Sequence, residues 1–443
     1  MNTKALRQKI LDLAIHGKLV PQDPNDEPAS VLLERIRDEK ERLIKEGKIK
    51  RSKKAKATSD KPHYENVPFE VPSSWGWCKL HDIIQITNGR SQKDVENVNG
   101  KYPIYGSGGI IGKAVEYLCE AGSTIIGRKG TINNPLFVEE RFWNIDTAFG
   151  MKPMYAISDL YFFYFCQYFD FSKLDKSTAV PSLTQSAIGE VFIPIPPINE
   201  QKHITDGISY WFGFIDTLES NLNNLQLTIK QTKSKILDLA IHGQLVPQDP
   251  TDEPASELLK RINPKAEITC DNGHYQKLPE GWAVCCLENV AKVLDNLRKP
   301  INSNERNSRI ANKHENELFP YYGATGQVGF IDDYLVDGTF LLLGEDGAPF
   351  LDKYAIKSYP IKGKCWVNNH AHILDPQCDF DYLMYYLNHV DYKDYVNGST
   401  RLKLTQSDMR SIIILLPPLT EQKRISVKVK YLFRLLDSIA CNL

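Results

Sequence analysis

The chain has 443 residues, of which 54 are Lys or Arg and 55 are Asp or Glu, so its formal net charge is -1. Net charge alone therefore selects no acidic partner, and a surface that binds a polyanion has to concentrate its basic residues locally. With 42% hydrophobic and 10% aromatic residues the chain can bury a full core, which excludes global disorder, and its length predicts about three units at roughly 150 residues each.

The composition also bears on cellular location. The longest apolar or aromatic runs, such as Tyr161 to Cys166 and Ile412 to Leu416, fall far short of the roughly 18 residues that a membrane helix needs. The amino terminus interrupts its apolar positions with Lys, Arg, Gln and Asp, unlike a secretory signal. Nine scattered cysteines without a CxxC pair suit reduced thiols. We therefore expect a cytoplasmic protein with no membrane partner.

The first element, residues 1–36, belongs to an internal repeat. KILDLAIHGKLVPQDP from Lys9 returns as KILDLAIHGQLVPQDP from Lys235, and LTQS and PPINEQK, from Leu183 and Pro196, return as LTQS and PPLTEQK from Leu404 and Pro417. Matches of this length indicate that half the chain is a diverged copy of the other half. The repeat also duplicates a histidine before a glycine, at His16 and His242. This pattern favours the carboxy-terminal end of a helix over a catalytic role.

The next segment, residues 37–61, is predicted to be a basic linker. Lysines and one arginine dominate Lys45 to Lys61, and the second half has no equivalent. Such charge runs are usually solvated linkers. An arm that contacts DNA phosphates is the alternative reading.

Residues 62–197 and 263–418 are expected to be two copies of one mixed domain. PSSWGWCKL from Pro72 resembles PEGWAVCCL from Pro279, YGSGGIIG from Tyr105 resembles YGATGQVG from Tyr322, and STIIGRKG from Ser123 resembles GTFLLLGEDG from Gly338. Short apolar runs bounded by Gly, Asn, Asp and Pro predict strands and turns. We expect these two regions to share a fold and to differ at its loops.

Residues 198–262 are predicted to be a coiled-coil helix about five heptads long. Its apolar positions follow alternating steps of four and three, with only Thr232 interrupting them; they are Ile204, Ile208, Trp211, Ile215, Leu218, Leu222, Leu225, Ile229, Ile236 and Leu239. Asn199, like Thr420 in the other copy, precedes Glu-Gln-Lys and is expected to cap the helix. Gly243 and Pro247 mark its end.

Residues 419–443 repeat the first part of this seam, with apolar positions at Ile425, Val429, Leu432, Leu436, Ile439 and Leu443. Only about four seam positions are missing between the two chain ends when the copies are overlaid. The terminal segments are therefore expected to abut as a broken helix antiparallel to the central one. The predicted fold is α+β: two mixed α/β domains joined by a long antiparallel coiled-coil helical pair, in a cyclic arrangement with pseudo-two-fold symmetry.

With the repeat, the two divergent domains and the LTQS…PPxxEQK block in place, the chain resembles the specificity (S) subunits of type I restriction-modification systems along essentially its whole length. The resemblance implies that each variable region is a target-recognition domain for one half of a gapped, asymmetric DNA sequence. It also implies that the helices set the spacing and dock two methyltransferase subunits, and that restriction subunits join them. S-adenosylmethionine, ATP and Mg are expected on those partners, with no cofactor on this chain.

The rival readings are the recognition part of a fused DNA methyltransferase or endonuclease, and a coiled-coil adaptor. The sequence has no GxGxxG, no Walker loop and no [DN]PP[YF] tetrapeptide, Asn134 to Phe137 being the nearest to the last. These absences argue against the enzyme. Two divergent domains on one scaffold argue against the adaptor. A zinc set of Cys365, His370, His372 and Cys378 fits no familiar ligand spacing and is not expected.

The predicted DNA contacts lie in matching loops of the two domains. IGRKGT from Ile126 presents Arg128 and Lys129, whereas LGEDGA from Leu343 presents Glu345 and Asp346. Arg128 suits guanine, and a carboxylate suits cytosine N4. The alternative is that the bases hold phosphate and the acids pair with nearby Arg or Lys. The full set of candidate DNA-binding residues is Arg90, Lys93, Arg128, Lys129, Thr131, Arg298, Lys299, Glu345, Asp346, Asn368, Asn369, Arg401 and Lys403.

Overall fold

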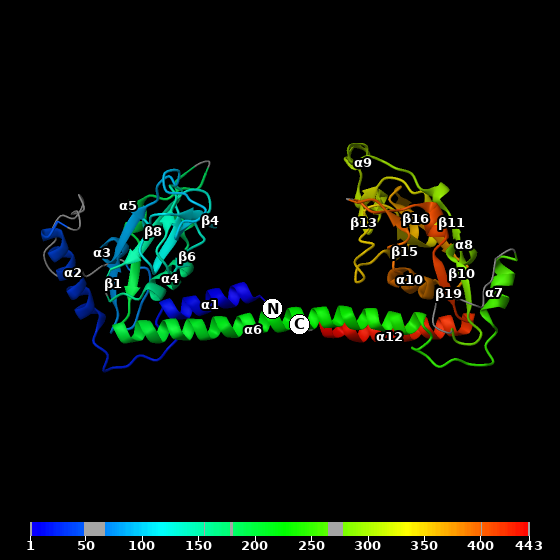
Figure 1. Ribbon diagram of the computed structural model, residues 1–443, viewed down its shortest axis with the longest axis horizontal. Coiled ribbons are helices and arrows are strands. Elements are labelled where there is room, and N and C mark those ends of the chain that lie inside the picture. Colours follow the sequence, from blue (N-terminus) through cyan, green and yellow to red (C-terminus); the bar gives the residue numbers. More distant parts are fainter. Residues whose placement is uncertain are drawn as a thin grey trace. The chain divides into compact units, whose positions relative to one another are not determined.

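The computed structural model describes residues 2–47, 67–154, 156–177, 180–264, 278–399 and 401–441. They form two compact units, Met1–Ser220 and Asn221–Leu443, and the boundary between the units falls inside the long helix α6 (Ile198–Ile241). Each unit holds one domain of mixed sheets and short helices packed on helical segments (Figure 1). The predicted α+β class is confirmed. No helix in the described ranges is long and apolar enough to cross a membrane.

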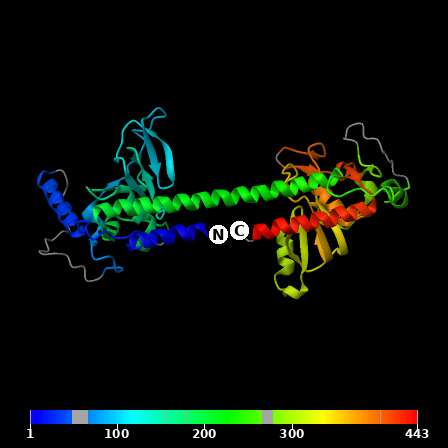
Figure 2. The same ribbon diagram turned by 90° about the horizontal axis from the view of Figure 1, so that it is seen from below.

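In the first unit, α1 (Thr3–Ile15) runs antiparallel to the first part of α6 (Figures 1 and 2). Arg7 forms ion pairs with Asp216 and Glu219 at 2.7 and 2.9 Å. The apolar faces of α1 and α6 join the core of the first domain through buried residues, which are Ile10, Leu11, Ala14, Ile15, Ile204, Ile208 and Ile215. Helix pair and domain therefore share one core.

The second unit repeats this arrangement with α12 (Leu419–Cys441) beside the last part of α6 (Figure 2). Lys233 pairs with Asp437 at 2.5 Å, and Ile236 and Ile425 are buried in one cluster with the second domain. The predicted antiparallel helix pair is thus confirmed within each unit.

The predicted seam is right at the isoleucines of α6 and wrong at some other positions. Ile204, Ile208, Ile215, Ile229 and Ile236 are buried, whereas Trp211, Leu225 and Ile439 are 43%, 37% and 47% exposed. A single neighbouring helix covers only one side of a broad apolar stripe, so residues on its margin stay open to solvent. Leu443 lies outside the described residues.

The expected caps at the helix starts are also wrong. The helices begin at Ile198 and Leu419, which places Asn199 and Thr420 inside the first turn. Their side chains donate instead to carboxylates of the PQDP repeat segments: Asn199 to Asp26 at 2.8 Å, and Thr420 to Asp252. The cap signal was misread because these side chains bond a distant loop rather than the local backbone.

The helix ends match the prediction. His16 and His242 follow α1 and α6, and each ring Nδ1 lies 2.7 or 2.8 Å from the carbonyl four residues earlier. Gly17 and Gly243 then adopt φ of +65° and +68°, the left-handed conformation in which glycine carries no steric cost. The structural reading of these histidines is confirmed.

The Glu-Gln pairs of the repeat attach each domain to its helices. Glu200 accepts a hydrogen bond from the Trp75 indole at 2.9 Å, and the neighbouring Gln201 accepts one from the Ser158 amide at 2.8 Å. In the second unit Glu421 and Gln422 do the same for Trp282 and the Asp379 amide, at 3.1 and 2.8 Å. Burial raises the pKa of the Glu200 and Glu421 carboxyls.

The first domain (67–197) is built from three small sheets. β1 (Gly76–Lys79) pairs with β9 (Phe192–Ile195). A four-stranded sheet has the order β2 (Ile84–Asn88), β8 (Ala148–Pro153), β5 (Ser123–Gly127), β6 (Leu136–Val138), and a three-stranded one the order β4 (Gly109–Ala114), β3 (Tyr102–Gly106), β7 (Trp143–Asn144). The helices are α2 (Ala29–Lys45), which precedes the domain, and α3 (Leu80–Ile83), α4 (Asp159–Tyr168), η1 (Phe171–Leu174) and α5 (Gln185–Gly189).

The second domain (278–418) follows the same plan. β10 (Ala283–Cys286) pairs with β19 (Ile413–Leu416), and a six-stranded sheet has the order β11 (Ala291–Val293), β16 (Ala371–Pro376), β14 (Val336–Gly344), β15 (Ser358–Val367), β12 (Phe319–Gly323), β13 (Gly326–Ile331); β17 (Val396–Asn397) pairs with β18 (Lys403–Leu404). The helices are α7 (Ala255–Ile262), which precedes the domain, and α8 (Leu287–Val290), η2 (Asp295–Leu297), α9 (Ser303–Ile310), η3 (Glu315–Glu317), α10 (Phe380–His389) and α11 (Gln406–Arg410). The expectation of one shared fold is confirmed.

The boundary of the expected basic linker differs from the structure. Helix α2 continues through Lys45, so the first part of the segment 37–61 is helical. The remaining basic residues, from Lys48 to Lys61, lie outside the described residues.

Candidate nucleic-acid interface

The loops after β5 and β14 occupy equivalent places in the two domains. Both strands end in buried residues, and Gly130 and Gly347 turn the chain with φ of +78° and +74°. The same backbone hydrogen bonds hold the first residue of each loop: Arg128 N–H to Thr147 at 2.8 Å and Leu183 N–H to Arg128 at 2.9 Å, against Glu345 N–H to His370 at 2.8 Å and Leu404 N–H to Glu345 at 2.7 Å. The predicted correspondence of the two loops is confirmed at the level of the backbone.

In the first domain the loop presents open cations. Arg128 is partly exposed and donates to the Asp146 carbonyl at 3.2 Å. The other candidates of this domain are all exposed: Arg90, Lys93, Lys129 and Thr131. None of their basic groups is ion-paired to a described acidic residue. These side chains are therefore available to a polyanion.

In the second domain the acids of the loop are already paired. Glu345 forms ion pairs with Arg298 and with Lys403, the latter at 3.1 Å. Asp346 pairs with Arg401 and lies 3.2 Å from Nδ1 of His370. The cations come from the loop after β11 and from the segment around β18, so three segments meet at this loop.

This network bears on the two expectations for Glu345. The residue is only 8% exposed, and its carboxylate pairs with Arg298 and Lys403. The structure shows the pairing alternative. Arg401 and Lys403 remain more than half exposed while paired. The surface predicted to present Glu345 and Asp346 therefore presents the cations that these acids hold.

Arg90 and Lys299 form a second equivalence between the domains. The amide of Arg90 donates to the Asn144 carbonyl at 3.0 Å and that of Lys299 to the Val367 carbonyl at 3.1 Å. Their own carbonyls accept from the indoles of Trp143 and Trp366, at 3.1 and 2.8 Å. Both side chains are exposed. Each domain thus fixes one cation at the same backbone position.

The two candidate asparagines differ in exposure. Asn368 is buried, and its Oδ1 accepts the His370 amide at 2.8 Å, which makes it a turn-forming residue. Asn369 is exposed, and its carbonyl accepts from Arg298 at 3.4 Å. Only Asn369 can present its side chain to a ligand.

The sequence reading missed Asp295, which organises the same network. Its carboxylate lies 2.7 Å from Nδ1 of the fully buried His372 and 3.2 Å from Arg298. Burial raises the pKa of Asp295, but the His372 hydrogen bond and the nearby positive charges outweigh burial and lower it overall. A lone acid after a short strand gave no pattern from which to predict this role.

Side chains that could bind a metal ion come close together at one place among the described residues. Within those ranges Asp295, Glu345 and His372 are the one set of suitable ligands, within 4.8 Å of one another. Arg298 already bonds both carboxylates, and Nε2 of His372 faces the Leu404 carbonyl at 3.0 Å. A cationic side chain thus neutralises this set. Cys365 lies in a separate apolar cluster from the one that Cys378 packs against, so the four residues considered for zinc do not gather.

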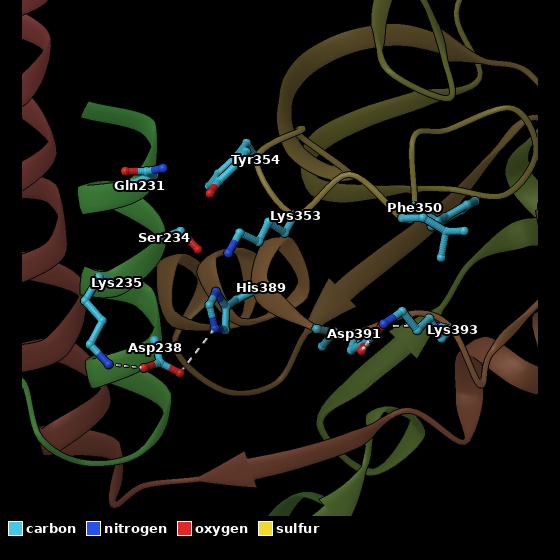
Figure 3. Close-up of a pocket in the computed structure, with 12 residues that line it drawn as sticks. Gln231, Ser234, Lys235, Asp238, Phe350, Lys353, Tyr354, His389, Asp391 and Lys393 are labelled. Atoms are coloured by element: carbon cyan, nitrogen blue, oxygen red, sulfur yellow. Dashed lines mark hydrogen bonds and ion pairs between the residues drawn. The ribbon is translucent and has the colours of Figure 1, made fainter. Parts of the chain in front are cut away.

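A cavity of about 670 Å³ lies between α6 and the domain of the second unit (Figure 3). Asp238 of α6 accepts from Lys235 at 2.6 Å and lies 3.7 Å from Nε2 of His389 at the end of α10. Burial lowers the pKa of His389, and Asp238 partly opposes that shift. Lys353 and Tyr354 line the opposite side (Figure 3). The contact between Asp238 and His389 joins the domain to its helix, whereas the Lys235–Asp238 pair lies within α6.

The fold thus presents two equivalent domains with cationic loops. The model of the family "Type I restriction modification DNA specificity domain" matches residues 72–227 and 279–441, so the chain belongs to this family. The two matched stretches cover both domains of this chain, so both are DNA specificity domains of the type I restriction-modification family.

Individual relatives are described in the same terms as the family. The EcoAI specificity subunit of Escherichia coli is 29% identical over 66% of this chain and 63% of its own length. This chain thus spans somewhat less than two thirds of that relative. The EcoEI specificity subunit of Escherichia coli is 24% identical over 99% of this chain and 90% of its own length. A solved chain described under complex assembly and conformational transition of the type I R-M system has a TM-score of 0.55, 15% identity, and coverage of 85% and 94%. It supports the fold.

Proposed function

We propose that the chain reads a bipartite, asymmetric DNA target, the first domain reading one half-site and the second the other, with an unread spacer between them. The observation that carries this is the reversal of charge on one backbone framework: Arg128 and Lys129 stand where Glu345 and Asp346 stand in the other domain. Identical loops would read identical half-sites. Loops of opposite charge on one backbone suit different ones.

The proposed contacts follow from exposure. In the first domain they are Arg90, Lys93, Arg128, Lys129 and Thr131, and in the second Lys299, Asn369, Arg401 and Lys403. Arg90 and Lys299, with their backbones fixed alike, suit phosphate, which positions a protein without reading sequence. Arg128 suits guanine O6 and N7. Arg298, Glu345, Asp346 and Asn368 hold the surface in place.

The spacer length is proposed to depend on α6. A helix of 44 residues extends about 66 Å at 1.5 Å per residue. Half-sites one DNA turn apart have centres about 34 to 36 Å from each other. We therefore expect the length of the unread spacer to follow the length of α6.

Two methyltransferase subunits are proposed to dock on the helices. The first unit exposes Tyr210, Trp211 and Phe214 on α6, and the second exposes Val427, Tyr431 and Leu435 on α12. Val427 and Tyr431 line a hollow of about 620 Å³. Exposed aromatic groups of this kind mark protein interfaces. Since the patch occurs once per unit, two copies of one partner fit, and restriction subunits with ATP and Mg would join them.

The test is the methylated motif of DNA modified by this chain with its methyltransferase partner, mapped by long-read sequencing. We expect a gapped, asymmetric motif. Arg128→Ala should relax one position of one half-site, at a cost of about 1 to 3 kcal/mol in binding. Arg90→Ala is the matched control, because loss of a phosphate contact weakens all sequences alike and lowers the salt slope. An ungapped motif, or none with the partner present, contradicts the proposal.

A further inference from the structure

The hairpins β3–β4 and β12–β13 are built alike in the two domains. Tyr105 faces Ile110 and Tyr322 faces Gln327, and in each hairpin a pair of glycines closes the ladder before a two-residue turn. Both hairpins also carry an irregularity in register just before that tyrosine. The two hairpins therefore share strand register and turn length despite their different sequences.

Each turn touches the loop that follows β5 or β14 in its own domain, which is the recognition loop of that domain. A Cβ placed on Gly127, at the start of the first loop, would lie 3.1 Å from Cβ of Ser107 in the turn. A Cβ placed on Gly344 would lie 3.0 Å from the carbonyl oxygen of Ala324. A Cβ at these two positions would also lie 1.9 Å from the Thr131 carbonyl oxygen and 2.5 Å from Cβ of Ala348, so glycine is needed within each loop as well as beside the turn. Hairpin turn and recognition loop thus form one continuous surface in each domain.

The residues just after the turn are exposed and chemically different. Ile110 and Ile111 are 63% and 53% exposed, so two adjacent aliphatic side chains of this hairpin are open to solvent. Gln327 and Val328 hold the equivalent places and are exposed as well. The neighbouring tyrosine and glycines are the same in both hairpins. The framework is therefore kept while the presented chemistry changes.

We propose that Ile110 and Gln327 are base-reading residues, which rests on the proposed function. An exposed aliphatic group suits the 5-methyl group of thymine, and a carboxamide suits the N6 and N7 edge of adenine. Nε2 of Gln327 donates one hydrogen to the Gly329 carbonyl at 3.1 Å. This bond orients the amide and leaves its second N–H for N7 and its oxygen for the N6 amino group.

The first experiment maps the methylated motif of full-length variants expressed with the methyltransferase partner. Ile110→Gln should change or relax one position in one half-site only, and Gln327→Leu one position in the other half-site only. Val98→Gln, a change at another exposed aliphatic residue of the first domain, is the matched control and should leave the motif intact. Thermal unfolding of each variant checks that the fold is kept.

The second experiment measures binding to a target duplex in which uracil replaces each thymine of the first half-site in turn, which removes only the methyl group. The wild-type chain should lose affinity several-fold at one position, and Ile110→Gln should be insensitive there. If both variants leave every position of a gapped motif unchanged, the base-reading assignment is wrong. If Ile110→Gln instead prevents co-purification with the methyltransferase, the hairpin is a protein contact and the assignment is equally wrong. A wild-type motif without a gap overturns the proposed function itself.

Discussion

At the scale of single residues, the second recognition loop shows how a sequence can mislead about charge. Glu345 and Asp346 look like an acidic surface, yet their partners Arg298, Arg401 and Lys403 neutralise them. The ionic contacts come from segments distant in sequence, and no local pattern predicts them. The acids therefore hold Arg298, Arg401 and Lys403 in place rather than forming an acidic surface.

The first prediction follows from this pairing. Glu345→Ala should destabilise the second unit by about 1 to 3 kcal/mol, because it removes one of the two carboxylates that pair with the mostly buried Arg298 and leaves only Asp295. Arg128→Ala at the equivalent place should change stability by less than about 0.5 kcal/mol, since Arg128 gives up a single hydrogen bond. Urea unfolding of the two variants measures both. Equal stability of both variants would contradict the network as described.

A second prediction concerns the buried carboxyls that join domain and helix. Burial raises the pKa of Glu200, so the folded state favours the protonated form. The stability this gives is fully present below the unfolded pKa and is lost as pH rises through the folded pKa. Glu200→Gln keeps an acceptor for Trp75 and removes the charge. The difference in unfolding free energy between the variant and wild type should therefore shift in favour of the variant as the pH is raised from about 4 to about 7.

Unfolding of wild type and Glu200→Gln at both pH values tests this. Glu421→Gln is the matched change in the second unit and should behave alike. Glu421 accepts a hydrogen bond from the equivalent tryptophan, Trp282, and its pKa is shifted in the same direction. Glu200→Leu, which leaves the Trp75 indole N–H without an acceptor, should cost about 1 to 3 kcal/mol. A difference between Gln variant and wild type that does not change with pH would show that the carboxyl is not desolvated.

At the scale of elements, the sequence predicts what depends on periodicity and misses what depends on neighbours. The isoleucine positions of α6, the helix ends at Gly17 and Gly243 and the equivalence of the two loops all follow from local spacing. The exposure of Trp211 and Leu225 does not, because it depends on which side the partner helix covers. The apparent cap at Asn199 failed for the same reason: its side chain bonds Asp26, in a loop far away in sequence.

The third prediction is argued at this scale. Seven residues inserted after Asn224 in α6 add about 10 Å at 1.5 Å per residue and return the helix to nearly the same face. The unread spacer should lengthen by about three base pairs, at 3.4 Å per pair, or binding should be lost. Asn224→Ala, which keeps the length, should leave the motif as it was. Long-read methylation mapping reads the spacer directly, and an unchanged spacer would mean that α6 does not set it.

At the scale of the whole molecule, the repeat makes each unit a complete copy of one design: a domain, a helix pair and a Glu-Gln attachment. The attachment residues Trp75 and Glu200, and Trp282 and Glu421, lie outside the stretches from β1 to β9 and from β10 to β19. A domain can therefore be exchanged at these strands without separating either Trp–Glu pair of the attachment. The repeat predicts pseudo-two-fold symmetry between the units, and such an exchange can test it.

The last prediction is for a chain in which residues 76–195 replace residues 283–416, so that the first domain occupies both positions. If the units are related by a two-fold axis, the two copies meet the duplex in opposite directions, and the methylated motif should be a gapped palindrome of the first half-site. A head-to-tail arrangement would give a direct repeat instead. The reciprocal chain, with both domains exchanged, is the control: a two-fold scaffold turned by half a rotation presents the same domains to the same half-sites, so its motif should equal that of the wild type. A direct repeat in the first chain, or a reordered motif in the second, would rule out the two-fold relation while leaving the two recognition domains themselves intact.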